Sequence, residues 1–320
     1  MAGMIEKVGA VLASATLLSG CGSNIVNALN LTPAYTEINL DSLPETLPDA
    51  VTQQIPNVVA LTDNIPFLSQ TEYCSGVRVD QRDYLSAGHC DYQLASNALT
   101  LCVDMSISSQ SAITADGESI PVIKKAGTFT GDTSGKVNIV LNNAPEDALL
   151  VETAYEPLPY STPTHFRDSS SEISPGTPLY LVNYEPTADN RLRSPYAKDL
   201  YANELQAGLN KPAIFGAIAL KQFSDGTTMA IAGIKSYSMP PETDARGGSS
   251  GGPVYDAAGN LVGTTINLFN YSSLPEVEND LGVTFKNSSN ETGVNVFLIQ
   301  DSTPSLIDDL QAKQQPTDGC

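Results

Sequence analysis

Short apolar segments separated by turn-forming residues recur along most of this sequence, and they limit its possible folds more than any other feature. Gly, Pro, Asn and Ser are frequent between the segments. Strands at this density, without long helical stretches between them, indicate an all-β sandwich or barrel. The segments are Tyr73–Val79, Val137–Leu141, Leu179–Val182, Met229–Ile234, Leu261–Ile266 and Val294–Ile299.

One helix is predicted near the end of the chain. Thr303 can cap its first turn and Pro304 suits that turn, because the first amides of a helix have no partner within it. Leu306, Ile307 and Leu310 follow at a spacing that places them on one apolar face.

The acidic composition excludes some classes of function. The 320-residue chain has 16 Lys and Arg against 36 Asp and Glu, a formal net charge of -20. Nucleic-acid binding needs clustered Lys and Arg, so we expect no nucleic-acid partner. Only two histidines are present, which leaves little room for a His-rich metal site. We expect neither a metal nor a cofactor.

The first 20 residues have the pattern of a signal peptide. Lys7 precedes an apolar run from Val8 to Leu18, which is too short to span a bilayer as a helix. A buried hydrophobic helix is the alternative. The end of the run, Leu18-Ser-Gly-Cys21, resembles a bacterial lipobox, which implies acylation of Cys21 and a membrane anchor.

The residue after the lipobox cysteine is Gly22, so the resemblance shows no Asp-type signal for retention in the inner membrane. It implies a lipid-anchored protein of a Gram-negative cell envelope, in the outer membrane or periplasm. Residues 21–55 are rich in Asn, Thr, Pro and Ser and have no sustained periodicity. They are predicted to form a tether that packs partly on the domain.

Two segments carry residue types suited to catalysis. The first, Gly247-Gly-Ser-Ser-Gly-Gly-Pro253, places serine within a glycine run. Such a run can be a flexible turn, but around a nucleophile it lets the backbone direct N–H groups at a developing oxyanion. The second, Ser86-Ala-Gly-His-Cys90, places His89 upstream of the serines. A histidine beside a cysteine is often structural, but this order of residues is one of the known triad orders.

Together these segments resemble the chymotrypsin/trypsin family of serine endopeptidases. Ser86–Cys90 is similar to the family's Thr-Ala-Ala-His-Cys, and Gly248–Pro253 is similar to Gly-Asp-Ser-Gly-Gly-Pro. Gly293-Val-Asn-Val-Phe297 and the predicted helix resemble its last strand and terminal helix. The resemblance implies two antiparallel six-stranded β-barrels with a short C-terminal helix, and an active site in the cleft between the barrels. The barrels are expected in residues 56–165 and 166–320.

The same resemblance implies a role for each residue of the site. Ser250 would be the nucleophile and His89 its base, and the backbone N–H groups of Gly248 and Ser250 would form the oxyanion hole. Of the aspartates between the histidine and the serine, two are weighed as the third member. Asp132 stands in a turn-like segment, whereas Asp147 precedes an apolar strand as in the family. Asp147 is therefore the preferred third member, although Leu149 stands where the family has a small residue.

The sequence departs from the family at two places. Ser249 replaces the aspartate that pairs with a newly cut amino terminus in zymogens, so that activation switch is expected to be absent. Asp244 occupies the family position at the base of the specificity pocket, where an acid selects Arg or Lys substrates. Arg246 could neutralise it, which would leave Asp244 an ordinary loop residue. The pocket-wall segment Gly263–Phe269 also lacks the usual Ser-Trp-Gly.

Five cysteines are present, and acylation of Cys21 would leave four for disulfides. Cys74 and Cys90 match a family disulfide that closes the loop carrying the histidine. Cys102 and Cys320 could pair in an oxidising compartment, or remain a buried thiol and a frayed terminus. His165 lies in the expected connection between the barrels and is assigned no role.

The function expected from the sequence is hydrolysis of protein or peptide substrates by a lipid-anchored serine endopeptidase. One alternative is a catalytically inactive protease-like lipoprotein that binds a protein or peptide partner. A purely structural envelope lipoprotein would leave the motif spacing as a coincidence. The aspartate is the residue whose assignment separates the enzyme from the inactive protein.

Overall fold

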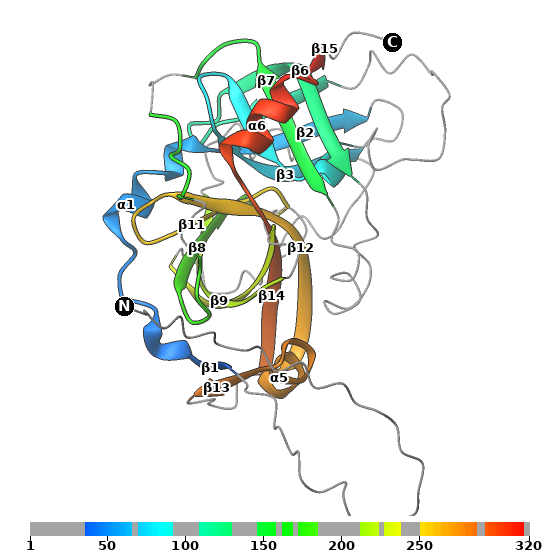
Figure 1. The fold of residues 1–320 in the computed structure, drawn as a ribbon. Coiled ribbons are helices and arrows are strands. Elements are labelled where there is room, and N and C mark those ends of the chain that lie inside the picture. Colours follow the sequence, from blue (N-terminus) through cyan, green and yellow to red (C-terminus); the bar gives the residue numbers. More distant parts are fainter. Residues whose placement is uncertain are drawn as a thin grey trace, which may run out of the picture. The chain divides into compact units, whose positions relative to one another are not determined.

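Two closed antiparallel β-barrels make up most of the described structure, which confirms the predicted fold class. The structure is a computed structural model, shown in Figure 1. It describes residues 36–65, 70–91, 109–129, 146–157, 162–168, 172–184, 212–223, 227–237, 250–286 and 292–316.

The first barrel is built from six successive strands in the order β6-β5-β2-β3-β4-β7, and pairing of β6 with β7 closes it. Every residue of β7 is buried, as expected of a strand covered on both faces. The strands are β2 (Val58–Ile65), β3 (Gln70–Arg78), β4 (Asp83–Ser86), β5 (Ser109–Ile113), β6 (Ser119–Phe129) and β7 (Asp147–Thr153).

The second barrel has the strand order β10-β14-β12-β11-β8-β9 and closes through β9 and β10. Five of the six apolar segments predicted as strands coincide with described strands, apart from Val79, which follows the end of β3; Val137–Leu141 lies outside the described residues. The strands are β8 (Pro178–Asn183), β9 (Ala213–Gln222), β10 (Thr228–Ser236), β11 (Pro253–Tyr255), β12 (Leu261–Ser273) and β14 (Thr292–Asp301).

Apolar side chains from both barrels share their clusters, so the boundary between the barrels is part of the core. Val58 and Ala60 on β2 belong to the same buried cluster as Tyr180 and Val182 on β8. Burial of apolar surface stabilises this contact by about 25 cal/mol per Å². The barrels are therefore held against each other by the same effect that fills each of them.

Residues 36–57, which include the later part of the predicted tether (residues 21–55), form short elements, and several of them pack on the second barrel. The hydroxyl of Tyr237 donates a hydrogen bond of 2.7 Å to the carbonyl oxygen of Pro44, and Leu43 lies against Gly216. Strand β1 pairs in parallel with β13. The elements are β1 (Thr36–Asn39), η1 (Leu40–Ser42), α1 (Asp49–Thr52), η2 (Ile55–Asn57) and β13 (Val283–Lys286).

The predicted C-terminal helix is present as α6 (Pro304–Gln311). The hydroxyl oxygen of Thr303 accepts a hydrogen bond from the amide of Leu306 at 3.2 Å, and Ile307 and Leu310 are buried. Although α6 follows the second barrel in sequence, it packs on β6 and β7 of the first (Figure 1). The short strand β15 (Gln315–Pro316) then pairs with β6. The end of the chain thus ties the two barrels together.

Helix α5 (Leu274–Leu281) was not predicted, and neither was the four-residue α1. Helix α5 follows β12 directly and buries Leu274, Val277 and Leu281. Gly282 ends it with a φ of 68°, a left-handed conformation that glycine adopts without a Cβ penalty. Among the described residues, no helix has both the length and the apolar character needed to cross a membrane.

Candidate active site

His89 lies in a single 3-10 turn, η3 (Gly88–Cys90), one residue after strand β4. The turn packs tightly on the first barrel: a Cβ on Gly88 would come 2.1 Å from the carbonyl oxygen of Thr128. A side chain at residue 88 would therefore displace the turn. The imidazole of His89 remains 26% exposed, so one part of the ring stays open to solvent.

Asp147, the first residue of β7, holds His89 at two points. Its Oδ2 lies 2.7 Å from Nδ1 of the imidazole, and its Oδ1 accepts a hydrogen bond of 2.8 Å from the backbone N–H of His89. The carboxylate is fully buried. Because one oxygen binds the ring and the other binds the backbone amide, a single carboxylate orients both parts of His89. Phe129 adds an edge contact to the ring, with centroids 6.2 Å apart.

The backbone of Asp147 is anchored from the other barrel. Its N–H donates a hydrogen bond of 2.9 Å to Oε1 of Gln300, a buried residue of β14. The two residues are 153 positions apart in the sequence. One side chain of the second barrel therefore contacts the residue that orients His89.

Asp301 follows Gln300 and faces Arg167, with 3.9 Å between a carboxylate oxygen and a guanidinium nitrogen. Burial raises the pKa of the Asp301 carboxyl, and the charge of Arg167 opposes this rise. Arg167 belongs to the connection between the barrels, where its amide donates to the carbonyl oxygen of Leu261 at 2.9 Å. The end of β14 is thus linked to that connection.

Ser250 lies in a turn just before β11, half-buried. Its carbonyl oxygen accepts a hydrogen bond of 2.7 Å from the amide of Ser75 on β3. The next residue, Gly251, has a φ of 76° and donates its amide to the carbonyl oxygen of Thr265 at 2.7 Å. These bonds attach the serine turn to both barrels.

Ser75 and Ser86 form a buried polar pair next to the serine turn. The hydroxyl of Ser86 donates to the carbonyl oxygen of Ser75 at 2.7 Å, and the hydroxyl oxygen of Ser75 accepts from the amide of Tyr184 at 2.8 Å. Ser86 stands three residues before His89. The segment that carries the histidine and the segment that carries Ser250 therefore meet at one corner of the first barrel.

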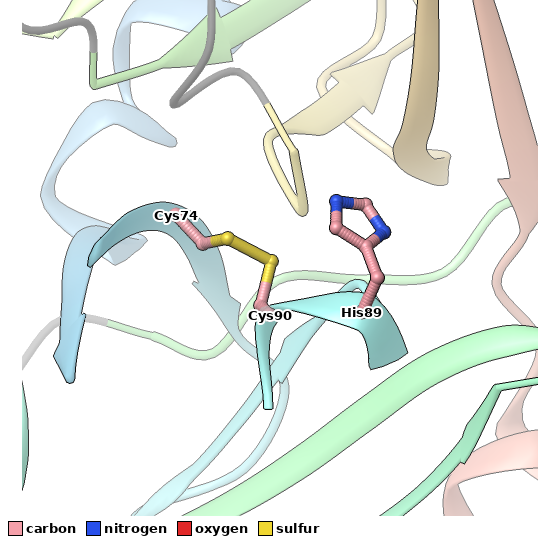
Figure 2. Close-up of side chains that lie close together, drawn as sticks. All are labelled: Cys74, His89 and Cys90. Carbon is pink, nitrogen blue, oxygen red and sulfur yellow. A yellow bond between two sulfur atoms is a disulfide. The ribbon is translucent and has the colours of Figure 1, made fainter. Parts of the chain in front are cut away.

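A disulfide joins Cys74 to Cys90, the pairing that the family resemblance implied, with a Cα–Cα distance of 6.1 Å. Figure 2 shows it linking β3 to the short turn from which His89 projects. The two sulfur atoms and the imidazole lie close enough to suggest a metal site. Both sulfurs are consumed in the S–S bond, however, so they cannot act as the thiolate ligands that metals prefer.

Several residues assigned from the sequence lie outside the described part of the chain. His165 is described and exposed, with its carbonyl oxygen accepting a hydrogen bond of 2.7 Å from the amide of Leu261. The assigned residues outside the described ranges are Cys21, Cys102, Asp132, Asp244, Arg246, Gly248, Ser249 and Cys320.

Sequence reasoning did not identify Gln300, Ser75 or Ser86 as parts of this region. Ser86 stands in the histidine motif, which could have drawn attention to it. Ser75 follows a cysteine of the expected disulfide, but its hydroxyl carries no signal of a distant partner. Gln300 stands at the end of an apolar strand, and no local pattern distinguishes it from a surface glutamine.

The sequence matches the model of the trypsin-like peptidase domain over residues 74–263. The match covers more than half of the chain and includes His89, Asp147 and Ser250. The protein therefore belongs to the trypsin-like peptidase family, and its fold is of a protease type. No curated protein matches the sequence.

Solved structures with a similar fold come from distant proteins, each 14% identical to this chain. One is a Glu endopeptidase in complex with MPD, with a TM-score of 0.46, covering 79% of this chain and 88% of its own. Another is an inactivated protease paralogue of the scabies mite, with a TM-score of 0.48 and coverages of 82% and 96%. A third is an HtrA-type protease with a tripeptide, with a TM-score of 0.41 and coverages of 82% and 62%.

Proposed function

We propose that this protein is a serine endopeptidase that hydrolyses peptide bonds in protein or peptide substrates through Ser250, His89 and Asp147. The observation that carries the proposal is the double contact of the buried Asp147 carboxylate with His89, at 2.7 Å to the ring and 2.8 Å to the backbone. A histidine held only for structural reasons does not need a buried carboxylate on its ring nitrogen.

The carboxylate would set the protonation of the imidazole. With Asp147 accepting from Nδ1, the proton of the neutral ring stays on Nδ1 and the lone pair of Nε2 is available as a base. The second contact, to the backbone amide of His89, keeps the carboxylate from rotating away. Asp147 would then stabilise the imidazolium that forms during the reaction.

The proposed acylation step uses these groups in sequence. The hydroxyl oxygen of Ser250 attacks the substrate carbonyl carbon while Nε2 of His89 takes its proton. The N–H groups of Gly248 and Ser250 stabilise the oxyanion, a contribution of about 3 kcal/mol for such a donor. Nε2 then gives the proton to the departing amine as the C–N bond breaks, which leaves the acyl chain on Ser250.

Deacylation repeats the chemistry with water. Nε2 takes a proton from the water as it attacks the acyl carbon, and returns the proton to Ser250 when the ester bond breaks. The products are a carboxylic acid and an amine fragment, and the serine is restored. The proposed cycle uses no cofactor.

Substrate choice and activation rest on residues outside the described ranges. Asp244 would select Arg or Lys by charge pairing, unless Arg246 neutralises it. Ser249 in place of the zymogen aspartate favours an enzyme that needs no cut amino terminus. Acylation of Cys21 would place the enzyme on a membrane of the cell envelope, with residues 22 to 35 as the link to the described domain.

The competing proposal is an inactive protease-like protein that binds a partner. A fluorophosphonate probe separates the two, because it reacts only with an activated serine. We expect the parent protein to be labelled and the Ser250→Ala and His89→Ala variants to remain unlabelled. His165→Ala changes the only other histidine of the chain and should be labelled like the parent. A correctly folded parent that is not labelled would contradict the enzyme proposal.

A further inference from the structure

Gln300 occupies the place where the hydrogen bonding of the first barrel ends beside Asp147. Strand β4 stops at Ser86, which lies opposite Leu149 of β7. The pairing of β4 with β7 therefore does not include Asp147, the first residue of β7, which is fully buried. A buried N–H without an acceptor is costly, and Gln300 of the second barrel provides that acceptor at 2.9 Å.

The glutamine is itself held firmly. It is 8% exposed and lies on a strand paired on both sides, opposite Thr228 of β10 and Thr264 of β12. Gly263 packs so closely that an added Cβ would come 2.2 Å from the Gln300 carbonyl oxygen. Because its backbone cannot shift easily, its side chain reaches Asp147 from a fixed position on the second barrel.

The contact is made to the backbone of a residue of the proposed triad. The residue whose N–H binds Gln300 is the same residue whose two carboxylate oxygens hold His89. Rotation of the Asp147 backbone would displace both oxygens together. An error of this kind in a supporting contact is known to reduce catalysis strongly, since the reacting groups must be held within a fraction of an ångström.

We propose that Gln300 is a positioning residue, through which the second barrel sets the orientation of Asp147 and hence of His89. The inference rests on the proposed function and adds to it a residue that does not touch the substrate. It also explains how the two barrels cooperate: the serine turn belongs to the second barrel and the histidine turn to the first, and Gln300 fixes the first relative to the second. Correct packing of the two barrels against each other would thereby bring the serine turn and the histidine turn into their working positions.

The test compares the kinetics of labelling by a fluorophosphonate in full-length variants. Gln300→Met keeps the length and approximate volume but removes the acceptor. We expect its maximal labelling rate to fall about 10-fold to 100-fold, with the half-saturating probe concentration nearly unchanged. Gln300→Glu keeps an oxygen that can accept from the Asp147 amide, and should recover most of the rate. Because Met also fills the space, a role in packing alone predicts a rate close to that of the parent in both variants.

Gln311→Leu is a matched control. It removes a different glutamine contact, a 2.8 Å hydrogen bond from α6 to Asp83 of the first barrel, and should label at the parent rate. If Gln300→Met does not fold, Gln300→Asn takes its place, since its amide is one methylene too short to reach Asp147. The same fall in maximal rate is then expected.

The outcomes separate this inference from the proposed function. A folded parent that does not react with the probe contradicts the proposed function. A reactive parent whose folded Gln300→Met variant reacts equally fast contradicts the positioning role alone. The positioning role is also wrong if the rate falls equally in the Met and Glu variants while both melt at the parent temperature.

Discussion

Gly251 lies directly against Ser86, so close that a Cβ on residue 251 would come 2.1 Å from the Ser86 hydroxyl oxygen. The same Cβ would come 2.2 Å from the carbonyl oxygen of Ser75. With its φ of 76°, Gly251 also has a conformation that favours glycine. Glycine is therefore required at residue 251, after the proposed nucleophile, for two reasons. The barrels approach too closely there for a side chain, and the turn needs a positive φ.

Substitution of Gly251 should damage both the fold and the labelling of Ser250. We expect Gly251→Ala to destabilise the protein by roughly 2–4 kcal/mol, from the unfavourable φ and the forced displacement of buried atoms. Gly176→Ala is the control, because Gly176 also has a positive φ of 88° but no atom lies within 4 Å of an added Cβ. It should cost about 1 kcal/mol and leave labelling unchanged. Urea unfolding measures the stability of both variants. An equal loss of stability in Gly251→Ala and Gly176→Ala would show that the Ser86 contact has no effect.

Removal of the charge on Asp147 should reduce turnover with little change in fold. Asp147→Asn can keep the contact to the His89 amide but favours the wrong tautomer of the ring. We expect a fall on the order of 10⁴-fold. Turnover is measured on the best substrate from a peptide library. Asp91→Asn is the control, since it removes a different buried aspartate, which pairs with Lys125 at 3.0 Å. An unchanged rate in Asp147→Asn would contradict the proposed triad.

Loss of the Cys74–Cys90 disulfide should lower stability. The cysteines are 16 positions apart, and closing a loop of this size contributes about 3 kcal/mol by restricting the unfolded chain. We expect the Cys74→Ala/Cys90→Ala variant to unfold at lower urea concentration than the parent. Reduction of the parent should give the same midpoint. A midpoint equal to that of the oxidised parent would show that the bond contributes nothing to stability.

Tyr84 is a buried tyrosine whose hydroxyl finds no hydrogen-bond partner within the described part of the chain. Burial raises the pKa of Tyr84 to about 12, and the nearby Arg78 guanidinium opposes the rise. An unfolded tyrosine ionises near pH 10. The stability that Tyr84 contributes is thus present below pH 10 and is lost as the pH rises toward 12.

Tyr84→Phe should therefore change stability by less than about 1 kcal/mol at pH 7, and should weaken the loss of stability between pH 10 and 12. Urea midpoints at pH 8 and pH 11 measure the effect. Tyr155→Phe is the control, since Tyr155 is 46% exposed and should leave the difference between the two midpoints unchanged. A parent-like difference in Tyr84→Phe would contradict the role given to burial.

Helices α6 and α5 show how much secondary structure can be predicted from neighbouring residues. Thr303 and Pro304 mark the start of α6, and the prediction was confirmed because capping depends on adjacent residues. Helix α5 also had signals, with Leu274, Val277 and Leu281 on one face and Gly282 behind them. It continues from β12 without a break, so no turn in the sequence marks where it begins.

The site shows the same division. The motifs around His89 and Ser250 identified two candidates, and an aspartate before an apolar strand pointed to Asp147 over Asp132. The contact of Asp147 with His89 is a finding of the structure, whereas the catalytic roles stay a prediction. Gln300 could not be found from sequence, since its partner is 153 positions away and hydrogen bonds between distant residues leave no pattern in either segment.

The sequence by itself indicated an all-β sandwich or barrel of short strands, a helix that begins at Pro304, and which residues are candidates for chemistry, whereas the choice of two barrels came from the family resemblance. Periodicity, turn residues and caps are properties of neighbouring residues, so they can be read locally. Only the tertiary structure decided that α6 packs on the first barrel, that Ser75 binds the serine turn, and that Gln300 anchors Asp147. These contacts depend on how each barrel closes and how the two barrels pack against each other. Both are set by the packing of the whole core.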